Sequence, residues 1–190
     1  MNRRGFLALT GAAALAAPAA DAHTLYKQWL VYRQKHLLIG SHRGPGGTFA
    51  AAQDLVSILG HLLPEAQARA ARAPFPERIA SLIGTRQMDV AVLLPEEARA
   101  IRNGSGEFRP YGQVPLTLLA DFRPHVIVAH ADFATHHGWL LAAAIHEGAV
   151  PPPVTLANGT GLPLHGGARA FLEGVDLETL AANPAAPPPG

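Results

Sequence analysis

Hydrophobic positions along the chain follow two patterns. In the first, apolar residues recur every three or four positions, as in a helix with one buried face. This pattern predicts helices over 48–63, 77–85, 96–101, 136–147 and 166–173. In the second, short apolar runs are bounded by turn residues, which indicates buried strands. It predicts strands over 37–40, 88–94, 116–120 and 125–129, while the alternation of small and basic residues over 66–73 predicts a further strand at an edge of the sheet.

The order of these elements predicts an α/β fold. Strands and helices alternate over the first half of the chain, which favours a mostly parallel sheet flanked by helices. The length of 190 residues suits one domain, which we place at 23–148. Residues 149–190 are rich in proline and glycine and form a C-terminal segment with a short closing helix.

The stretch SHRGPGGTF, residues 41–49, connects the first strand to the first helix. It lacks the Lys-Ser/Thr pair of a P-loop and the spacing of a dinucleotide fingerprint. Ligands of α/β sheets bind outside the carboxyl ends of strands, and a helix N-terminus favours anions. With Thr48 taken as the N-cap, this loop is either an anion or carboxylate site or a tight turn that binds nothing.

Composition and the N-terminus narrow the functional classes. Residues 2–7, NRRGFL, form a twin-arginine motif, and Ala20-Asp21-Ala22 is an A-x-A cleavage signal after an alanine-rich stretch. We therefore expect 1–22 to be a twin-arginine signal peptide that directs the protein to the periplasm. An uncleaved anchor is the alternative. The formal net charge of +1 gives no electrostatic reason to expect nucleic acid as a partner.

The chain offers little for catalysis or metal binding. It has no cysteine, no G-x-S-x-G motif and no H-x-x-x-H pair, so we expect neither an enzyme nor a resident cofactor or metal. One alternative stays open at the new N-terminus. If cleavage follows Ala22, the amine and imidazole of His23 could chelate Cu(II), which prefers nitrogen donors.

Four stretches resemble the TAXI-type solute receptors of TRAP transporters, which have the periplasmic-binding-protein type II fold. They occur in the same order as in that family and are LLIGSHRGPGGTFAAAQDLVSIL from Leu37, RIASLIGTRQMDVAVLLPEEA from Arg78, HVIVAHADF from His125 and LPLHGGARAFLEG from Leu162. The last is the most distinctive. Receptors of this family have two lobes, whereas this chain supplies the elements of a single lobe. His42 and Arg43 stand where the family has small residues.

The resemblance implies a small, anionic organic solute and a membrane transporter as partners. Its site would contain Ser41, His42, Arg43, Gly46, Gly47, Thr48, Pro74 and Glu96, with Arg43 as counter-charge. One lobe supplies only half of such a site, and small ligands need most of their surface buried. The alternative is therefore an accessory module that docks onto another exported protein.

Overall fold

The computed structural model describes residues 36–149 and 160–182. All of them belong to one compact unit, Arg33–Gly190. The expected signal peptide, 1–22, and His23 lie outside the described residues. Within those residues, no helix has the length and apolar character needed to cross a membrane.

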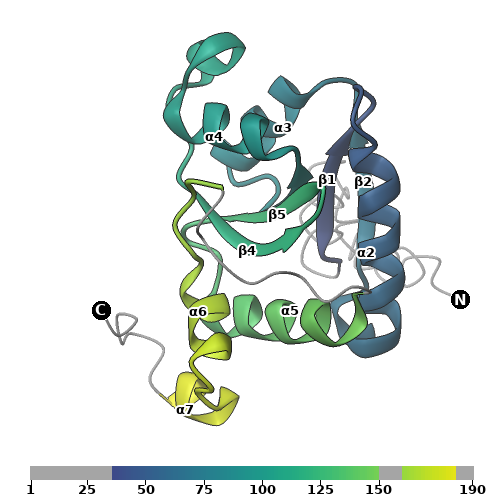
Figure 1. Cartoon of the computed structure of the whole chain (residues 1–190), viewed down its shortest axis with the longest axis vertical. Coiled ribbons are helices and arrows are strands. Elements are labelled where there is room, and N and C mark those ends of the chain that lie inside the picture. Colours follow the sequence, from purple (N-terminus) through teal and green to yellow (C-terminus); the bar gives the residue numbers. More distant parts are fainter. Residues whose placement is uncertain (1–35, 150–159, 183–190) are drawn as a thin grey trace, which may run out of the picture. The chain divides into compact units, whose positions relative to one another are not determined.

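Five strands form one sheet in the order β2-β1-β3-β5-β4 (Figure 1). Their bounds are Leu38–His42 for β1, Arg69–Ala73 for β2, Val90–Leu93 for β3, Leu116–Phe122 for β4 and His125–His130 for β5. The strand predicted at an edge of the sheet, β2, does lie there. The α/β class with flanking helices is confirmed.

The prediction of a mostly parallel sheet is wrong, because the sheet is mixed. β1 pairs in parallel with β2 and β3, whereas β5 is antiparallel to both β3 and β4. Only Arg123 and Pro124 separate β4 from β5. A parallel neighbour needs a crossover of a dozen or more residues, so this short turn forces β5 to run back along β4.

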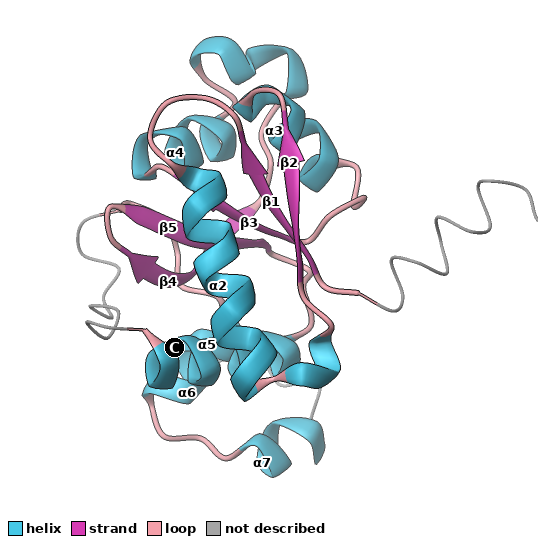
Figure 2. Cartoon of the chain, turned by 90° about the vertical axis from the view of Figure 1, so that its right-hand side faces the viewer, coloured by secondary structure: helices cyan, strands magenta, loops and turns pink. Residues whose placement is uncertain are grey.

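Helices cover both faces of the sheet (Figures 1 and 2). Their bounds are Thr48–Leu62 for α2, Pro76–Gly84 for α3, Pro95–Asn103 for α4, Thr135–Gly148 for α5, Gly166–Leu172 for α6 and Leu177–Ala182 for α7. Two 3-10 turns follow helices: Pro64–Ala66 lies between α2 and β2, and Gly106–Tyr111 lies between α4 and β4. The predicted helices are confirmed within a few residues, and α7 is an addition. Pro64 begins the turn that follows α2.

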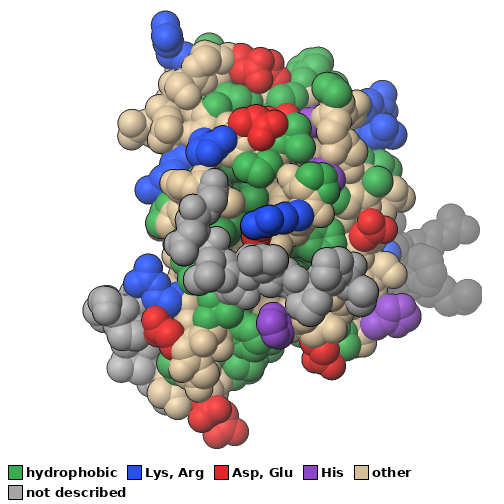
Figure 3. Space-filling view, in the orientation of Figure 1, with side chains coloured by type: hydrophobic (Ala, Val, Ile, Leu, Met, Phe, Trp, Pro, Cys, Tyr) green, Lys and Arg blue, Asp and Glu red, His purple; other side chains and the backbone are tan. Residues whose placement is uncertain are grey.

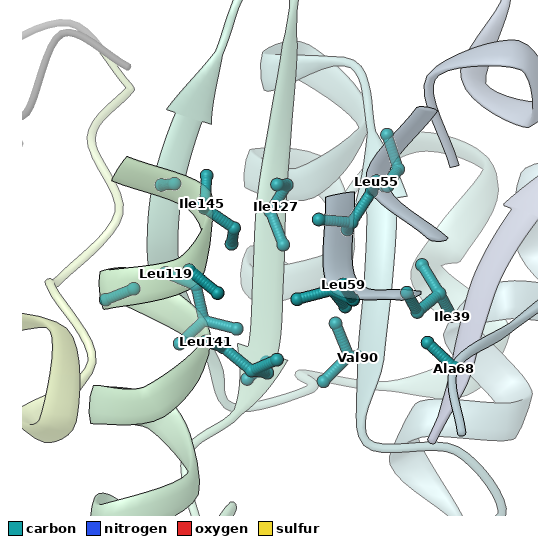
Figure 4. Packing of buried hydrophobic residues seen from close by; sticks show 14 of the residues in the cluster. Ile39, Leu55, Leu59, Ala68, Val90, Leu119, Ile127, Leu141 and Ile145 are labelled. Atoms are coloured by element: carbon teal, nitrogen blue, oxygen red, sulfur yellow. The ribbon is translucent and has the colours of Figure 1, made fainter. Parts of the chain in front are cut away.

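Two apolar clusters hold these layers together. On one face, Leu59 of α2 and Ile145 of α5 pack against Ile127 and other residues of the sheet (Figure 4). On the other face, Ile79 of α3 and Ile101 of α4 pack in a second cluster. Burying a side chain of this size contributes roughly 1.5–3 kcal/mol. At the surface shown in Figure 3, acidic and basic side chains are interspersed, with no broad field of one sign.

The distinctive LPLHGGARAFLEG stretch has a structural role in this fold. His165 is the N-cap of α6, where its Nδ1 accepts a hydrogen bond from the Gly167 N–H at 3.1 Å. Its Nε2 lies 3.0 Å from the Phe133 carbonyl oxygen and donates to it. Gly167 and Gly138 lie where α6 crosses α5, and a Cβ on Gly167 would collide with the Thr135 carbonyl oxygen. This stretch therefore closes the fold.

Candidate functional site

Three helices begin at the same edge of the sheet. β1, β2 and β3 run parallel to one another, and each is followed by a short loop and a helix. The helix is α2 after β1, α3 after β2 and α4 after β3. In Figure 2 the first two strands point toward the upper edge, from which α2 descends. The predicted site residues from the glycine loop, Pro74 and Glu96 therefore lie at one edge, as strand order in an α/β sheet requires.

Two predicted hydroxyl donors hold the loop together and face inward. Ser41 is fully buried, and its hydroxyl donates to the Ala71 carbonyl oxygen at 3.0 Å. The buried Thr48 hydroxyl accepts from the His42 N–H at 3.1 Å and donates to the His42 carbonyl oxygen at 3.2 Å. Thr48 therefore fastens the start of α2 to the end of β1. The expected N-cap position belongs to Gly47 instead.

His42 links the glycine loop to the start of α4. Its side chain is 1% exposed, and its Nδ1 accepts from the Gly44 N–H at 3.0 Å. The proton of the neutral ring is therefore on Nε2, which donates to Glu97 Oε2 at 3.1 Å. The same carboxylate oxygen accepts from the Leu94 N–H at 3.0 Å. Both ring nitrogens are thus engaged in structural contacts.

Gly46 and Gly47 adopt a backbone conformation that favours glycine. Their φ angles are 101° and 74°, and a Cβ on Gly46 would lie 2.9 Å from Leu94 Cδ1. The carbonyl oxygen of Gly46 accepts a hydrogen bond from His125 Nε2, which anchors the loop to β5. Around Gly47 a Cβ would meet nothing within 4 Å, so this side of the loop is open.

The positive end of the α2 helix dipole has no acidic side chain in the first turn to compensate it. The first turn of α2 has no acidic residue, whereas Glu77 lies in the first turn of α3 and two glutamates lie in that of α4. Among the described residues, the N–H groups of Gly47, Thr48 and Phe49 have no acceptor. Such orphan amides attract anions. The Arg72 guanidinium adds charge nearby, because it lies 4.6 Å from the Phe49 ring centroid.

The predicted site residues therefore divide into two groups. Ser41, His42 and Thr48 are buried and order the loop, while the others are exposed at the edge. These others are Arg43, Gly46, Gly47, Pro74 and Glu96. Glu97 and His125 were not among the predicted site residues. The sequence contains a signal for Glu97, because a glutamate at the third position of a helix commonly accepts a hydrogen bond from the N–H of the residue that precedes the helix. His125 had none.

Two further observations concern metal ligands and known proteins. Among residues 36–149 and 160–182, no group of three or more His, Asp or Glu side chains could hold a metal ion. Comparison with protein-family models, with curated proteins and with solved structures finds no match. The likeness to TAXI-type receptors therefore rests on the four stretches quoted above.

Proposed function

We propose that the chain is a non-catalytic binding protein of the periplasm that holds a small organic anion at the start of α2. One observation carries the proposal. Of the three helices that start at this edge, α2 alone has no acidic residue in its first turn, and its first amides have no acceptor among the described residues. Backbone N–H groups at a helix N-terminus bind carboxylates and phosphates through hydrogen bonds and the helix dipole.

The surrounding side chains support binding over catalysis. His42 has a partner on each ring nitrogen, and the Ser41 hydroxyl donates to the backbone, so neither is poised as base or nucleophile. Arg43 is exposed directly after β1 and can form a bidentate pair with a carboxylate. The loop is ordered before any ligand arrives, which lowers the entropic cost of binding.

The resemblance implies that the second half of the site comes from elsewhere. Two-lobed receptors close on a ligand and exclude water, which strengthens polar contacts. We propose that here a partner chain, such as a membrane transporter subunit reached after twin-arginine export, supplies the opposing face. Binding by the single lobe is then weak, and it strengthens when the partner is present.

A thermal-unfolding screen tests the proposal. The purified chain is heated with dicarboxylates, amino acids and divalent metals, and a ligand of the native state raises the unfolding midpoint by mass action. We expect dicarboxylates to raise the midpoint. Binding should weaken in Arg43→Gln. A midpoint unchanged by every anion, at concentrations up to those that saturate weak sites, would contradict the proposal.

A charge placed at the third helical position sharpens the test. Ala50→Glu puts a carboxylate next to the open amides, where it should stabilise α2 by about 0.3–1 kcal/mol and compete with the ligand. Ser57→Glu is the matched control, because it adds the same charge to the exposed face about two turns away, where the dipole effect has faded. Anion binding should be lost in Ala50→Glu and retained in Ser57→Glu.

A second candidate function is docking of a protein partner at the same edge. Phe75, at the start of α3, is 57% exposed, and an exposed aromatic side chain is a common anchor of interfaces. A photo-crosslinking residue at position 75 should then capture a specific partner in the periplasm, and one at Gln53 should not. The copper alternative, at His23, is tested by Cu(II) uptake in the same screen and its loss in His23→Ala.

A further inference from the structure

A cavity of about 370 Å³ lies at the opposite edge of the sheet from the glycine loop. It is lined by the start of β1, the turn that follows α2, the residues before β3, the residues after β5 and the first half of α5. Its apolar wall includes Leu38, Leu63, Met88, Phe133 and Leu141. A volume of this size lies within the range of small-molecule sites, so the cavity can accommodate a compact apolar body.

The arginine at the rim of this cavity is already neutralised. Arg86 Nη2 lies 3.1 Å from Asp89 Oδ1, and Nη1 lies 3.4 Å from Asp132 Oδ2. Nη1 also donates to His130 Nδ1, which fixes the guanidinium in place. Two carboxylates and one imidazole therefore face the one guanidinium. An anionic ligand would have to displace these contacts.

The remaining charge of the cavity is negative. Glu65 and Asp89 both line it, and Asp132 lies just beyond. Burial is the main factor that lowers the pKa of His130 and also that of His137, so both imidazoles are neutral at pH 7. Against one arginine, the cavity and its rim thus hold three carboxylates. A net excess of negative charge favours a cation.

Most helix ends near the cavity add negative potential, as its carboxylates do. α2 ends at Leu62 and α3 ends at Gly84, each within two residues of a side chain that lines the cavity. Helix C-termini carry a partial negative charge. The partial positive charge at the N-terminus of α5, beside His137, offsets the partial negative charge of one of these two C-termini. The backbone therefore adds to the negative potential set by the carboxylates.

We propose that this cavity binds an amphipathic organic cation, with its apolar body against Leu63, Met88 and Phe133 and its ammonium group at the carboxylate of Glu65. The cavity is separate from the edge where the proposed anion binds, and the two ligands have opposite charge. The proposal therefore stands or falls independently of the proposed function.

Three probes with the same six-carbon chain test the proposal: hexylammonium, hexanol and hexanoate. Each is titrated into the purified, isotopically labelled chain, and backbone amide shifts of Leu38, Gln87 and Phe133 are followed by two-dimensional NMR. Hexylammonium should shift these amides saturably, with an affinity at least about tenfold above that of hexanoate, because like charges repel. Equal or tighter binding of hexanoate or hexanol would overturn the charge assignment, and no saturable shift would overturn the site.

Variants test the role of the Glu65 carboxylate and the position of the binding site separately. Glu65→Gln should weaken hexylammonium binding by about two- to fivefold, the range for an exposed ion pair. Glu107→Gln, an exposed acid elsewhere, should leave it unchanged. Leu140→Trp fills the cavity and should abolish binding of all three probes while the far-UV circular dichroism stays native. Unchanged affinity in both Glu65→Gln and Leu140→Trp would overturn the proposal.

Discussion

Glu97 offers the sharpest test of how the glycine loop is ordered, because one carboxylate oxygen serves two donors. Glu97→Ala removes the acceptor of the Leu94 N–H and that of His42 Nε2. The His42 side chain is 1% exposed, so water reaches the orphaned ring N–H poorly. An unsatisfied buried donor costs about 1–3 kcal/mol, and loss of a carboxylate from a first helical turn costs about 0.3–1 kcal/mol.

The expected result is a loss of roughly 2 kcal/mol in the free energy of unfolding, measured by urea denaturation with circular dichroism at 222 nm. Glu96→Ala is the matched control, because this exposed neighbour in the same turn has a favourable dipole interaction but no hydrogen-bond or ion-pair partner among the described residues. It should lose no more than about 1 kcal/mol. Equal losses in the two variants would refute the reasoning that the His42–Glu97 contact orders the loop.

The same pair of variants links stability to function. In Glu97→Ala the loop loses its tie to α4, so the open amides of α2 are held less firmly for a ligand. Dicarboxylate affinity should therefore fall in Glu97→Ala. In Glu96→Ala it should stay equal or rise, because a nearby negative charge is removed. A rise in both variants would mean that charge alone, and not loop order, governs binding.

Two further predictions concern the rest of the fold. Gly167→Ala should destabilise the chain by about 1–3 kcal/mol, because its Cβ meets the Thr135 carbonyl oxygen. Gly60→Ala has open space around it in α2 and should instead stabilise the chain by roughly 0.5–1 kcal/mol. Urea midpoints that shift in the same direction in both variants would contradict this prediction. Burial lowers the pKa of His165 from its usual 6.5, so the unfolded chain takes up the proton first and stability should fall as pH drops below about 6.5. His165→Asn, which keeps an N-cap acceptor but cannot titrate, should flatten this part of the stability–pH curve.

The periodicity of apolar residues is sufficient to predict most elements of the fold, since it reports burial directly. In α2 the fully buried Ala52, Leu55 and Leu59 are the positions that the helical spacing selects. Strand direction is a different matter, because buried apolar runs look alike in parallel and antiparallel neighbours. The signal for β5 lay in the two-residue connection before it, which is too short for a crossover.

The place of the candidate site was predictable, but the orientation of its side chains was not. The first strand was expected to end at Gly40, yet β1 continues to His42. Ser41 and His42 are therefore strand residues covered by the layers on either side, and their polar groups bond within the protein. Such contacts depend on residues far along the chain, such as Ala71 and Glu97, that no local pattern connects to the loop.

Strand direction also explains why the two proposed sites prefer opposite charges. Because β1, β2 and β3 are aligned, the helices that follow them begin at one edge and run back toward the other. The first edge collects positive helix ends, and carboxylates neutralise those of α3 and α4 while that of α2 stays open. At the second edge, the C-termini of α2 and α3 add to the carboxylates around the cavity. Exchanging the charge of the probe should therefore move binding from one edge to the other.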